Sequence, residues 1–379
     1  MKIREIRAVG LRGQTPEGGW SDEIKEEDCV YTLVAVLTDE DVVGYGSVYT
    51  NDALVQGALQ VLEPLYVSEN ALEPERVTEK LRQHMFWMGR GGTLTHTISG
   101  IDIALWDILG KATGQPVGRL LGGRYRTRVR PYASLLMEEP DPLVDHLLML
   151  EAQGFRAFKM GWGPFGRASH IMDEKIVRAA RDAIGPDALL MVDAGGSDAF
   201  WPHGYKWALR TARMLADYDV TWFEEPLKPD AQDDYVLLRQ HASVPIAGGE
   251  VLTRRQTFLP WLRAGAFDIV QPDATKVGGL SESRRIGWMA SDYGVRLIPH
   301  GWNTAIGLAA DLHLASALPE TDLVEYLTGS PYVDELVTGG WQVDEDGMLP
   351  VPDAPGLGIE LDLEAVARYT GGNAWPDAK

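Results

Sequence analysis

The 379-residue chain has little cysteine, no long apolar run and no excess of positive charge. Its single Cys29 excludes an internal disulfide and suits a reducing cytoplasm, the expected location. No apolar stretch is long enough to cross a bilayer as a helix. The formal net charge of -20 argues against nucleic acid and anionic membranes as partners, because both attract basic surfaces. An anionic substrate would need local positive charge, from a metal ion or from a few Lys and Arg side chains.

The length suits two domains rather than one. The first 50 residues alternate like strands, with a hairpin expected from Val30–Leu37 and Val42–Val48 through an acidic turn. Apolar residues then recur at helical spacing up to residue 112. A segment rich in Gly and Pro follows, KATGQPVGRLLGG, which places a domain boundary near residue 125.

From Val129 onward, short β-branched runs alternate with helix-like segments. Strands alternating with helices predict a parallel sheet, and eight of them at this spacing predict a barrel. The strands are expected near residues 129–135, 156–160, 188–193, 221–224, 244–247, 267–270, 295–298 and 322–326. We therefore predict an α+β N-terminal domain (1–125), a barrel (126–330) and a C-terminal segment (331–379) that packs back on the first domain.

Three consecutive predicted barrel strands end in carboxylates. Asp193 lies in MVDAGG, Glu224 in WFEEP and Glu250 in PIAGGE. Neighbouring strands are about 4.8 Å apart, so their ends can direct three carboxylates at one ion. Three oxygen ligands with open positions suit Mg²⁺ better than Zn²⁺. The alternative is that these are helix N-caps. In WFEEP, Glu225 also competes as ligand, but alternation along a strand should send the two side chains to opposite sides.

The next two strands end in IVQPDATKVGG, with Asp273, and LIPHGW, with His300. A carboxylate beside an imidazole orients the ring and raises its basicity, which suits a general base. The alternative for His300 is a structural, hydrogen-bonded histidine. Lys159 ends the second strand, where an ammonium could neutralise a substrate carboxylate or act in acid/base chemistry. Glu325 ends the eighth strand, where it could bond a substrate oxygen as a protonated acid.

Together, these five motifs and the segment SGIDIALWDILGKATGQPVGRLLGG resemble the enolase superfamily, in particular its mandelate racemase-like branch. The resemblance covers nearly the whole chain. It implies a capping domain on a modified (β/α)₇β barrel, and a symmetric homo-oligomer. It also implies one Mg²⁺ that stabilises an enediolate after removal of the proton α to a carboxylate.

Residue by residue, Asp193, Glu224 and Glu250 match the metal ligands of that branch. Glu224 is preferred over Glu225 because it stands two positions before the proline. Asp273 and His300 match its Asp–His dyad, and Glu325 matches a late-strand carboxylate that polarises the substrate. The cap loop 13–27 and the segment 49–52 would set substrate specificity.

One position departs from the branch. Its second strand usually ends in two lysines one residue apart, whereas FKMGWG has Lys159 and then Gly161. A second base opposite His300 is therefore missing. Racemisation needs groups on both faces of the α-carbon, but one base can remove the α-proton and then help a β-hydroxyl leave. We therefore predict a sugar-acid dehydratase that gives a 2-keto-3-deoxy acid from an aldonic or aldaric acid.

Four further residues are weaker candidates. His203 could be a dedicated acid or bind substrate, and Trp162, Trp201 and Trp302 could line the pocket, although each could equally be an ordinary loop or packing residue. A lactone cycloisomerase, an epimerase with another base, and a non-catalytic metal-binding homologue remain alternatives.

Overall fold

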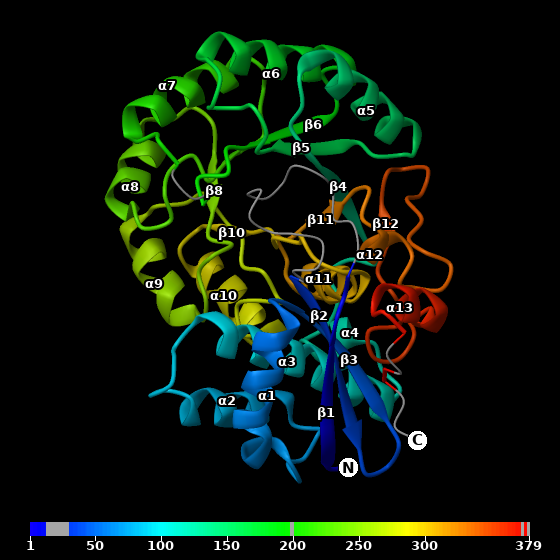
Figure 1. Ribbon diagram of the computed structural model, residues 1–379. Helices are drawn as coiled ribbons and strands as arrows, with labels where there is room; N and C mark the ends of the chain where they lie inside the picture. Colours follow the sequence, from blue (N-terminus) through cyan, green and yellow to red (C-terminus); the bar gives the residue numbers. More distant parts are fainter. Residues whose placement is uncertain (13–29, 198–200, 373–374, 377–379) are drawn as a thin grey trace.

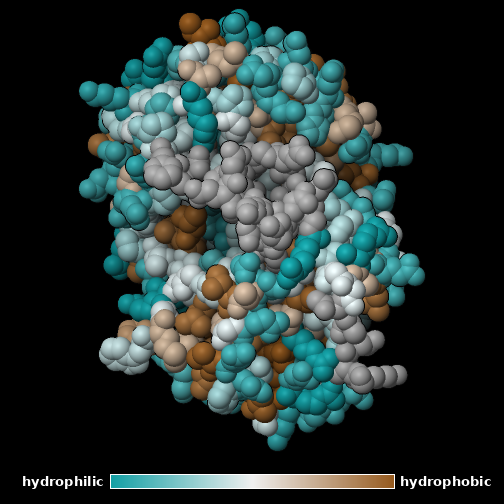
Figure 2. All heavy atoms as spheres, viewed as in Figure 1, coloured by the Kyte–Doolittle hydropathy of each residue, from teal (hydrophilic) through white to brown (hydrophobic). Residues whose placement is uncertain are grey.

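The computed structural model describes residues 1–12, 30–197, 201–372 and 375–376. The predicted loop at 13–27 lies outside the described residues. In Figure 1 the N-terminal domain lies below the barrel, and the helices that follow the barrel strands form an arc around the outside of the sheet. On the face shown in Figure 2 the surface is largely hydrophilic with scattered apolar residues, as is usual for a globular protein.

The N-terminal domain is a three-stranded antiparallel sheet covered by helices. Its strands, in the spatial order β1-β2-β3, are β1 (Ile3–Gly10), β2 (Tyr31–Thr38) and β3 (Val43–Tyr49). Its helices are α1 (Asp52–Tyr66), α2 (Pro74–His84) and α3 (Gly92–Thr113). The predicted hairpin is thus confirmed within a few residues, and helices occupy the region up to Thr113 where helical spacing was found in the sequence.

Glycine lets α3 lie directly on this sheet. A Cβ at Gly46 would stand 2.0 Å from the carbonyl oxygen of Gly100, so only a residue without a side chain fits there. This close approach fixes the position of β3, whose last residue, Tyr49, reaches the pocket described below.

Eight parallel strands form the second domain. Their spatial order is β10-β9-β8-β7-β6-β5-β4-β11, which is sequential apart from β11 beside β4. They are β4 (Arg128–Leu136), β5 (Ala157–Gly161), β6 (Leu189–Asp193), β7 (Phe223–Glu224), β8 (Ile246–Gly248), β9 (Ile269–Val270), β10 (Arg296–Leu297) and β11 (Leu323–Leu327). The sheet curls so that β10 and β11 meet through Thr321, whose hydroxyl donates to the Leu297 carbonyl at 2.8 Å. The predicted barrel-like fold is confirmed.

Helices follow the barrel strands and cover their outer face. They are α5 (Pro140–Ala152), α6 (His170–Ile184), α7 (Tyr205–Ala216), α8 (Gln232–His241), α9 (Arg255–Ala264), α10 (Gly279–Asp292) and α11 (Ala305–Ala317). Inside the sheet, buried apolar side chains from alternate strand positions make a separate cluster that includes Tyr132, Met191 and Trp222. The interior is therefore packed, and chemistry is left to the strand ends. Among the described residues, no helix is long and apolar enough to cross a membrane.

The end of the chain returns to the N-terminal domain. After the short α12 (Pro331–Asp334), β12 (Leu349–Pro350) pairs antiparallel with β4, and α13 (Leu363–Tyr369) follows. The amide of Arg12 donates to the Tyr369 carbonyl at 2.6 Å, and the Trp375 ring lies 5.7 Å from that of Tyr45.

A buried polar seam holds the first domain against the barrel. Oδ1 of Asp102 on α3 accepts a hydrogen bond from the Ser281 amide at 2.9 Å, and Oδ2 accepts one from the Ser281 hydroxyl at 2.5 Å. The Trp106 indole, also on α3, donates to the same hydroxyl at 3.0 Å. Together with α4 (Val117–Leu120) and the turns beside it, this seam sets the cap over the strand ends.

Candidate active site

A pocket opens at the carboxyl ends of the barrel strands, where the cap contributes Tyr49. It has about 350 Å³ of free space, part of it open to solvent, and is lined by Tyr49, Leu136, Lys159, Trp162, Asp193, Glu250, His300 and Trp302. Six of these eight residues were predicted from the sequence: Lys159, Trp162, Asp193, Glu250, His300 and Trp302. The strand-end motifs therefore converge on one cavity.

The three predicted ligand carboxylates lie near this cavity. Asp193 is the last residue of β6 and pairs in register with Glu224, the last residue of β7. Glu250 follows β8 by two residues, in a turn rather than at the strand end. Burial raises the pKa of Asp193 well above its ordinary value, and the negative charges of Glu224 and Glu250 raise it further. The three groups are thus close enough to repel one another.

Glu224 is fully buried and held by three donors. Lys159 Nζ donates to its Oε1 at 2.7 Å. The Trp222 indole and the Gln271 amide donate to its Oε2 at 2.9 and 2.7 Å. These bonds orient the carboxylate, since neither oxygen is left without a partner.

Glu225 departs from the alternation expected for a strand. The strand ends at Glu224, and Glu225 has a φ of 40°, so the chain turns there. Its carboxyl group is buried, and its pKa is raised well above the ordinary value by burial and then by Glu250 and Asp193. Alternation does not apply past the end of β7, so the expected separation of Glu224 and Glu225 onto opposite sides stays a prediction, and Glu225 does not line the pocket.

Lys159 is the central cation of the site. Its Nζ lies 2.7 Å from Glu224 Oε1, 3.0 Å from Glu325 Oε1 and 4.0 Å from Asp193 Oδ2. Burial opposes the charged form, but Glu224 and Glu325 outweigh it, and the pKa of Lys159 is raised well above its ordinary value. A solvated lysine at the rim is therefore excluded, and the side chain stays an ammonium.

Glu325 lies in the middle of β11 rather than at its end, and it is buried inside the sheet. Its Oε2 accepts from the Gly301 amide at 2.7 Å and from the Tyr132 hydroxyl at 3.2 Å. Although burial opposes ionisation, Lys159 and His300 lower the pKa of Glu325 to about 2. The prediction of a protonated acid is corrected: Glu325 is an ionised partner of Lys159 and does not line the pocket.

Asp273 and His300 form a hydrogen-bonded pair. A parallel bridge joins the two residues beyond β9 and β10, and His300 Nδ1 lies 2.7 Å from Asp273 Oδ2. The other oxygen, Oδ1, accepts from the amide and the hydroxyl of Thr275 at 2.7 and 2.5 Å. Burial opposes the ionisation of Asp273, but Lys276 and His300 lower its pKa to about 2.

Because Nδ1 of His300 is bonded to Asp273, the other ring nitrogen, Nε2, is the one that can face the pocket. With Nδ1 donating to an ionised Asp273, Nε2 of a neutral His300 is a proton acceptor. It lies 3.1 Å from Glu250 Oε2, a contact in which Nε2 carries the proton and donates it, so Nε2 can accept a proton only after this contact is released. Burial opposes protonation, but Glu250 and then Glu325 and Asp273 raise the pKa of His300 above its ordinary value. A carboxylate-oriented imidazole facing a cavity has the geometry of a general base.

The four weaker candidates separate into two groups. Trp162 and Trp302 line the pocket, so the structure brings both to the site. His203 does not line it. Its ring stacks on Trp207 with centroids 4.3 Å apart, and its Nε2 contacts the Gly166 carbonyl. Trp201, also suggested as a pocket residue, is buried and donates to the Pro226 carbonyl at 3.1 Å. Both expectations are corrected, because the loop before α7 folds onto α7 and away from the cavity.

Several residues of the site were missed from the sequence. Trp222 and Gln271 orient Glu224, and Lys276 lies 3.7 Å from Asp273 Oδ2. Trp222 stands two residues before Glu224, and Gln271 two before Asp273. A side-chain period of two puts such pairs on one face of a strand, and this signal could have identified both.

The acidic group fits a hard divalent cation in chemistry and in charge. The carboxylates of Asp193, Glu224 and Glu250 offer the oxygen ligands Mg²⁺ prefers, and a cation among them would offset the repulsion that helps to raise the pKa of Asp193. As they stand, no three His, Cys, Asp or Glu side chains surround one point closely enough to coordinate an ion, in the part of the chain that is described. Asp193, Glu224 and Glu250 are the residues that would hold it after side-chain adjustment.

A capped parallel barrel with buried carboxylates and an Asp–His pair at its strand ends defines an enolase-like protein. Comparison with known families agrees. Residues 143–366 match the family described as "Enolase C-terminal domain-like", and residues 25–122 match the "Mandelate racemase / muconate lactonizing enzyme, N-terminal domain". The chain belongs to the mandelate racemase / muconate lactonizing enzyme family of the enolase superfamily.

The relatives that match nearly the whole chain include cycloisomerases and dehydratases. D-galactarolactone cycloisomerase of Agrobacterium fabrum is 32% identical over 97% of this chain and 99% of its own length. D-xylonate dehydratase of Haloferax volcanii is 33% identical over 97% of this chain and 94% of its own length. Among solved structures, 3,6-anhydro-D-galactonate cycloisomerase from Zobellia galactanivorans superposes with a TM-score of 0.87 at 32% identity, covering 97% of this chain and 99% of that one.

Proposed function

We propose that this protein is a Mg²⁺-dependent dehydratase of an acid sugar, an aldonic or aldaric acid. The main observation behind this proposal is that the two sides of the pocket differ in their proton-transfer groups. One side has the Asp273–His300 pair, with Nε2 of His300 at the cavity. The other has Gly161, which carries no side chain, and Lys159, which is held as an ammonium by buried carboxylates. One proton-transfer group is enough for elimination, whereas 1,1-proton transfer needs two.

His300 would act twice in the reaction. Nε2 first takes the proton from the carbon α to the substrate carboxylate, while Asp273 holds the ring by Nδ1 and stabilises the imidazolium. The imidazolium then returns its proton to the β-hydroxyl, the C–O bond breaks and water leaves. The resulting enol becomes a 2-keto-3-deoxy acid. One C–H bond and one C–O bond are broken, and no oxidant is needed.

The other residues would bind charge and exclude water. When bound, Mg²⁺ supplies Lewis-acid stabilisation of the negative charge that develops on the substrate carboxylate. Lys159 and its partners fix the carboxylates on this side of the pocket, so that positive charge is oriented before the substrate arrives. Tyr49 closes the cavity from the cap, and Trp162 and Trp302 offer apolar faces to the carbon skeleton of a sugar acid.

Relatives support the proposal at the level of substrate class. Besides the D-xylonate dehydratase, an arabinonate dehydratase of Saccharolobus solfataricus is 34% identical over 86% of this chain. The second candidate function is a cycloisomerase of a sugar lactone, which the similarity to the two cycloisomerases favours. Such a reaction also starts with one proton abstraction, so the same pocket serves it. Product identity decides between them, because only dehydration gives an α-keto acid.

A panel of aldonic and aldaric acids incubated with the Mg²⁺-loaded protein tests the proposal. We expect α-keto acid from at least one member, trapped as its semicarbazone. EDTA should abolish product formation and added Mg²⁺ should restore it. Full activity in EDTA would refute the metal assignment. Solvent deuterium in recovered substrate without keto-acid product would instead indicate an epimerase, and turnover of lactones alone would indicate the cycloisomerase.

A further inference from the structure

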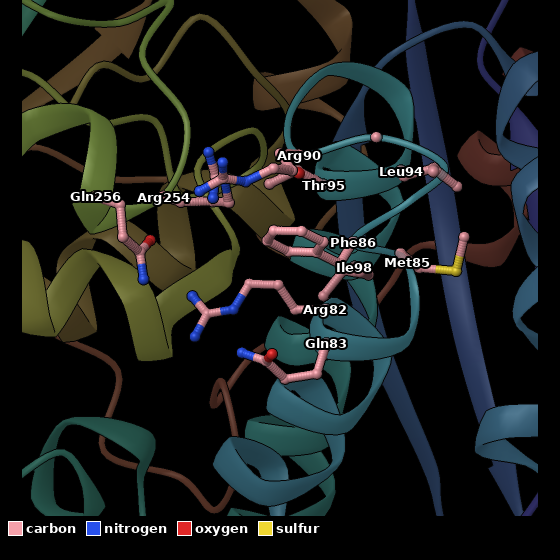
Figure 3. A pocket seen from close by; sticks show the side chains of 11 residues that line it. Arg82, Gln83, Met85, Phe86, Arg90, Leu94, Thr95, Ile98, Arg254 and Gln256 are labelled. Carbon is pink, nitrogen blue, oxygen red and sulfur yellow. The ribbon is translucent and has the colours of Figure 1, made fainter.

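A second pocket lies where the cap meets the barrel, away from the strand-end cavity. The cap supplies the end of α2, the start of α3 and the connection between them, and the barrel supplies the beginning of α9 (Figure 3). Its walls are Arg82, Gln83, Met85, Phe86, Gly89, Arg90, Leu94, Thr95, Ile98, Arg254 and Gln256. It has about 500 Å³ of free space, part of it open to solvent. Three arginines thus border one cavity in a chain whose net charge is -20.

These arginines differ in how their charge is balanced. Arg82 is paired with Glu79 and lies 2.6 Å from Glu282 Oε1. Among the described residues, neither Arg90 nor Arg254 has a carboxylate within 4.0 Å. Figure 3 shows the side chains of Arg90 and Arg254 reaching toward each other, Arg90 from the cap and Arg254 from the barrel. Two guanidinium charges are therefore left without a counter-ion in the described parts of the chain.

Of these two arginines, Arg254 is the more unusual, because it is buried whereas Arg90 is exposed. It is only 9% exposed, and its Nε is buried with no hydrogen-bond partner in the described part of the chain. Burial lowers the pKa of Arg254, and the positive charges of Arg90 and Arg82 lower it further. Its backbone also has a φ of 64°, which a residue with a side chain rarely adopts. A buried, unpaired guanidinium beside two others is unfavourable unless an anion completes the group.

We propose that this pocket is a binding site for the dianionic phosphate group of a small molecule. Two uncompensated guanidiniums match the charge of a phosphate monoester, which is close to -2 at pH 7, and their planar forks match its oxygens. Gln83, Thr95 and Gln256 add hydrogen-bonding groups at the walls.

The rest of the pocket is apolar. The Arg90 guanidinium lies 4.8 Å from the centre of the Phe86 ring, and Met85, Leu94 and Ile98 continue this surface. An organic body attached to the phosphate therefore has an apolar face to contact. Free phosphate and a phosphate ester share the charged part of the site, and only the ester uses the apolar part.

The site is joined to the active-site pocket by a short loop. Arg254 stands four residues after Glu250, and the Leu252 amide in between donates to the Gly249 carbonyl at 3.1 Å. The Arg254 amide donates to the Val277 carbonyl at 2.9 Å. An anion held by the Arg254 side chain would thus bind to the same loop that carries Glu250.

Titration calorimetry on the full-length, Mg²⁺-loaded protein tests the site, with inorganic phosphate and glycerol 3-phosphate as separate probes. We expect saturable binding of at least one probe. Arg90→Gln and Arg254→Gln should each weaken it about tenfold or more, since each removes a charge-assisted hydrogen bond. The matched control is Arg263→Gln, an exposed arginine on α9 outside the pocket, which should leave binding unchanged. Tighter binding of the ester would identify an organic phosphate, and equal binding would identify phosphate itself.

Three results would overturn the proposal. The first is no saturable binding of either probe. The second is equal weakening by Arg263→Gln, which would show only general attraction of anions. The third is that this surface binds a second copy of the chain instead of an anion. Trp87, next to Phe86, is 92% exposed and could take part in such a contact. If Arg90→Gln shifts the oligomeric state in gel filtration and phosphate does not bind, the arginines meet a second copy of the chain. Arg90 is exposed, so its variant remains informative even where Arg254→Gln fails to fold.

Discussion

The two sides of the strand-end pocket use charge differently. Beside β9 and β10, His300 lies between Asp273 and Glu250 and has a nitrogen that can take up or release a proton at the cavity. Beside β5, Lys159 contacts Glu224 and Glu325 in the interior, and these two carboxylates keep the pKa of Lys159 well above its ordinary value. The first arrangement can move a proton, whereas the second holds a fixed charge pattern. Changes on the first side should therefore affect rate, and changes on the second should affect stability first.

His300→Asn should give the largest effect. It removes the proton-accepting nitrogen while keeping a side chain that can bond to Asp273, so α-proton exchange with D₂O should fall by about 10²–10⁴-fold. The free energy of unfolding should change little by comparison. The control is His241→Asn, an exposed histidine on α8, which should exchange at the normal rate. Undiminished exchange in His300→Asn would move the base to another residue.

Lys159→Met should act mainly on stability. Glu224 and Glu325 would lose their buried counter-charge, and breaking such a group typically destabilises a protein by about 3–5 kcal/mol. Urea unfolding without added metal measures the change. Lys175→Met, at an exposed position on α6, should stay within about 0.5 kcal/mol of the parent protein. If both variants unfold alike, the carboxylates beside Lys159 do not depend on its charge.

Gly161→Ala tests whether the side of the pocket at position 161 has room for a side chain. A Cβ at this position would stand 2.8 Å from the Cβ of Asp193, so the new methyl group must displace a buried neighbour. Overpacking of this kind costs about 1–3 kcal/mol. Gly57→Ala is the matched control: nothing lies within 4 Å of its Cβ position in α1, and removal of a helical glycine should stabilise by about 0.5–1 kcal/mol. A Gly161→Ala protein as stable as its parent would mean that the face accepts a side chain.

Trp302→Phe should have the smallest effect. Trp302 follows His300 by two residues, and its indole Nε1 is buried without a hydrogen-bond partner among the described residues. If this group binds substrate, its loss should raise KM about 2–10-fold and leave kcat nearly unchanged. Trp288→Phe, on the outer surface of α10, serves as control. A fall in kcat with unchanged KM would give Trp302 a part in the chemistry instead of in binding.

The fold was largely predictable because the local hydrophobic pattern of each strand and helix matches the way that element packs in the folded protein. Strand ends were readable since an apolar run stops at a charged residue, and adjacent strands necessarily carry Asp273 and His300 side by side. Charge state was less predictable. The ionised form of Glu325 depends on Lys159, which lies far away in sequence.

Loop positions were also beyond the sequence pattern. The segment with Trp201 and His203 packs on α7 because Trp207 offers a ring to stack against, and no periodic signal reports this. Glu225 stays near the acidic group because the chain turns at a positive φ, which a strand pattern does not show. The arginine pocket joins residues about 170 positions apart, and only the assembled cap and barrel bring them together.

The contact between position 161 and Asp193 limits how this enzyme can change its activity in evolution or by engineering. A second base would have to start from a Cβ that the present backbone places against Asp193, a predicted metal ligand. One substitution that adds the base would disturb that ligand at the same time. The two positions are therefore coupled, and a compensating change around Asp193 has to accompany the new side chain. A two-base racemase is separated from this protein by a pair of dependent mutations rather than by a single step.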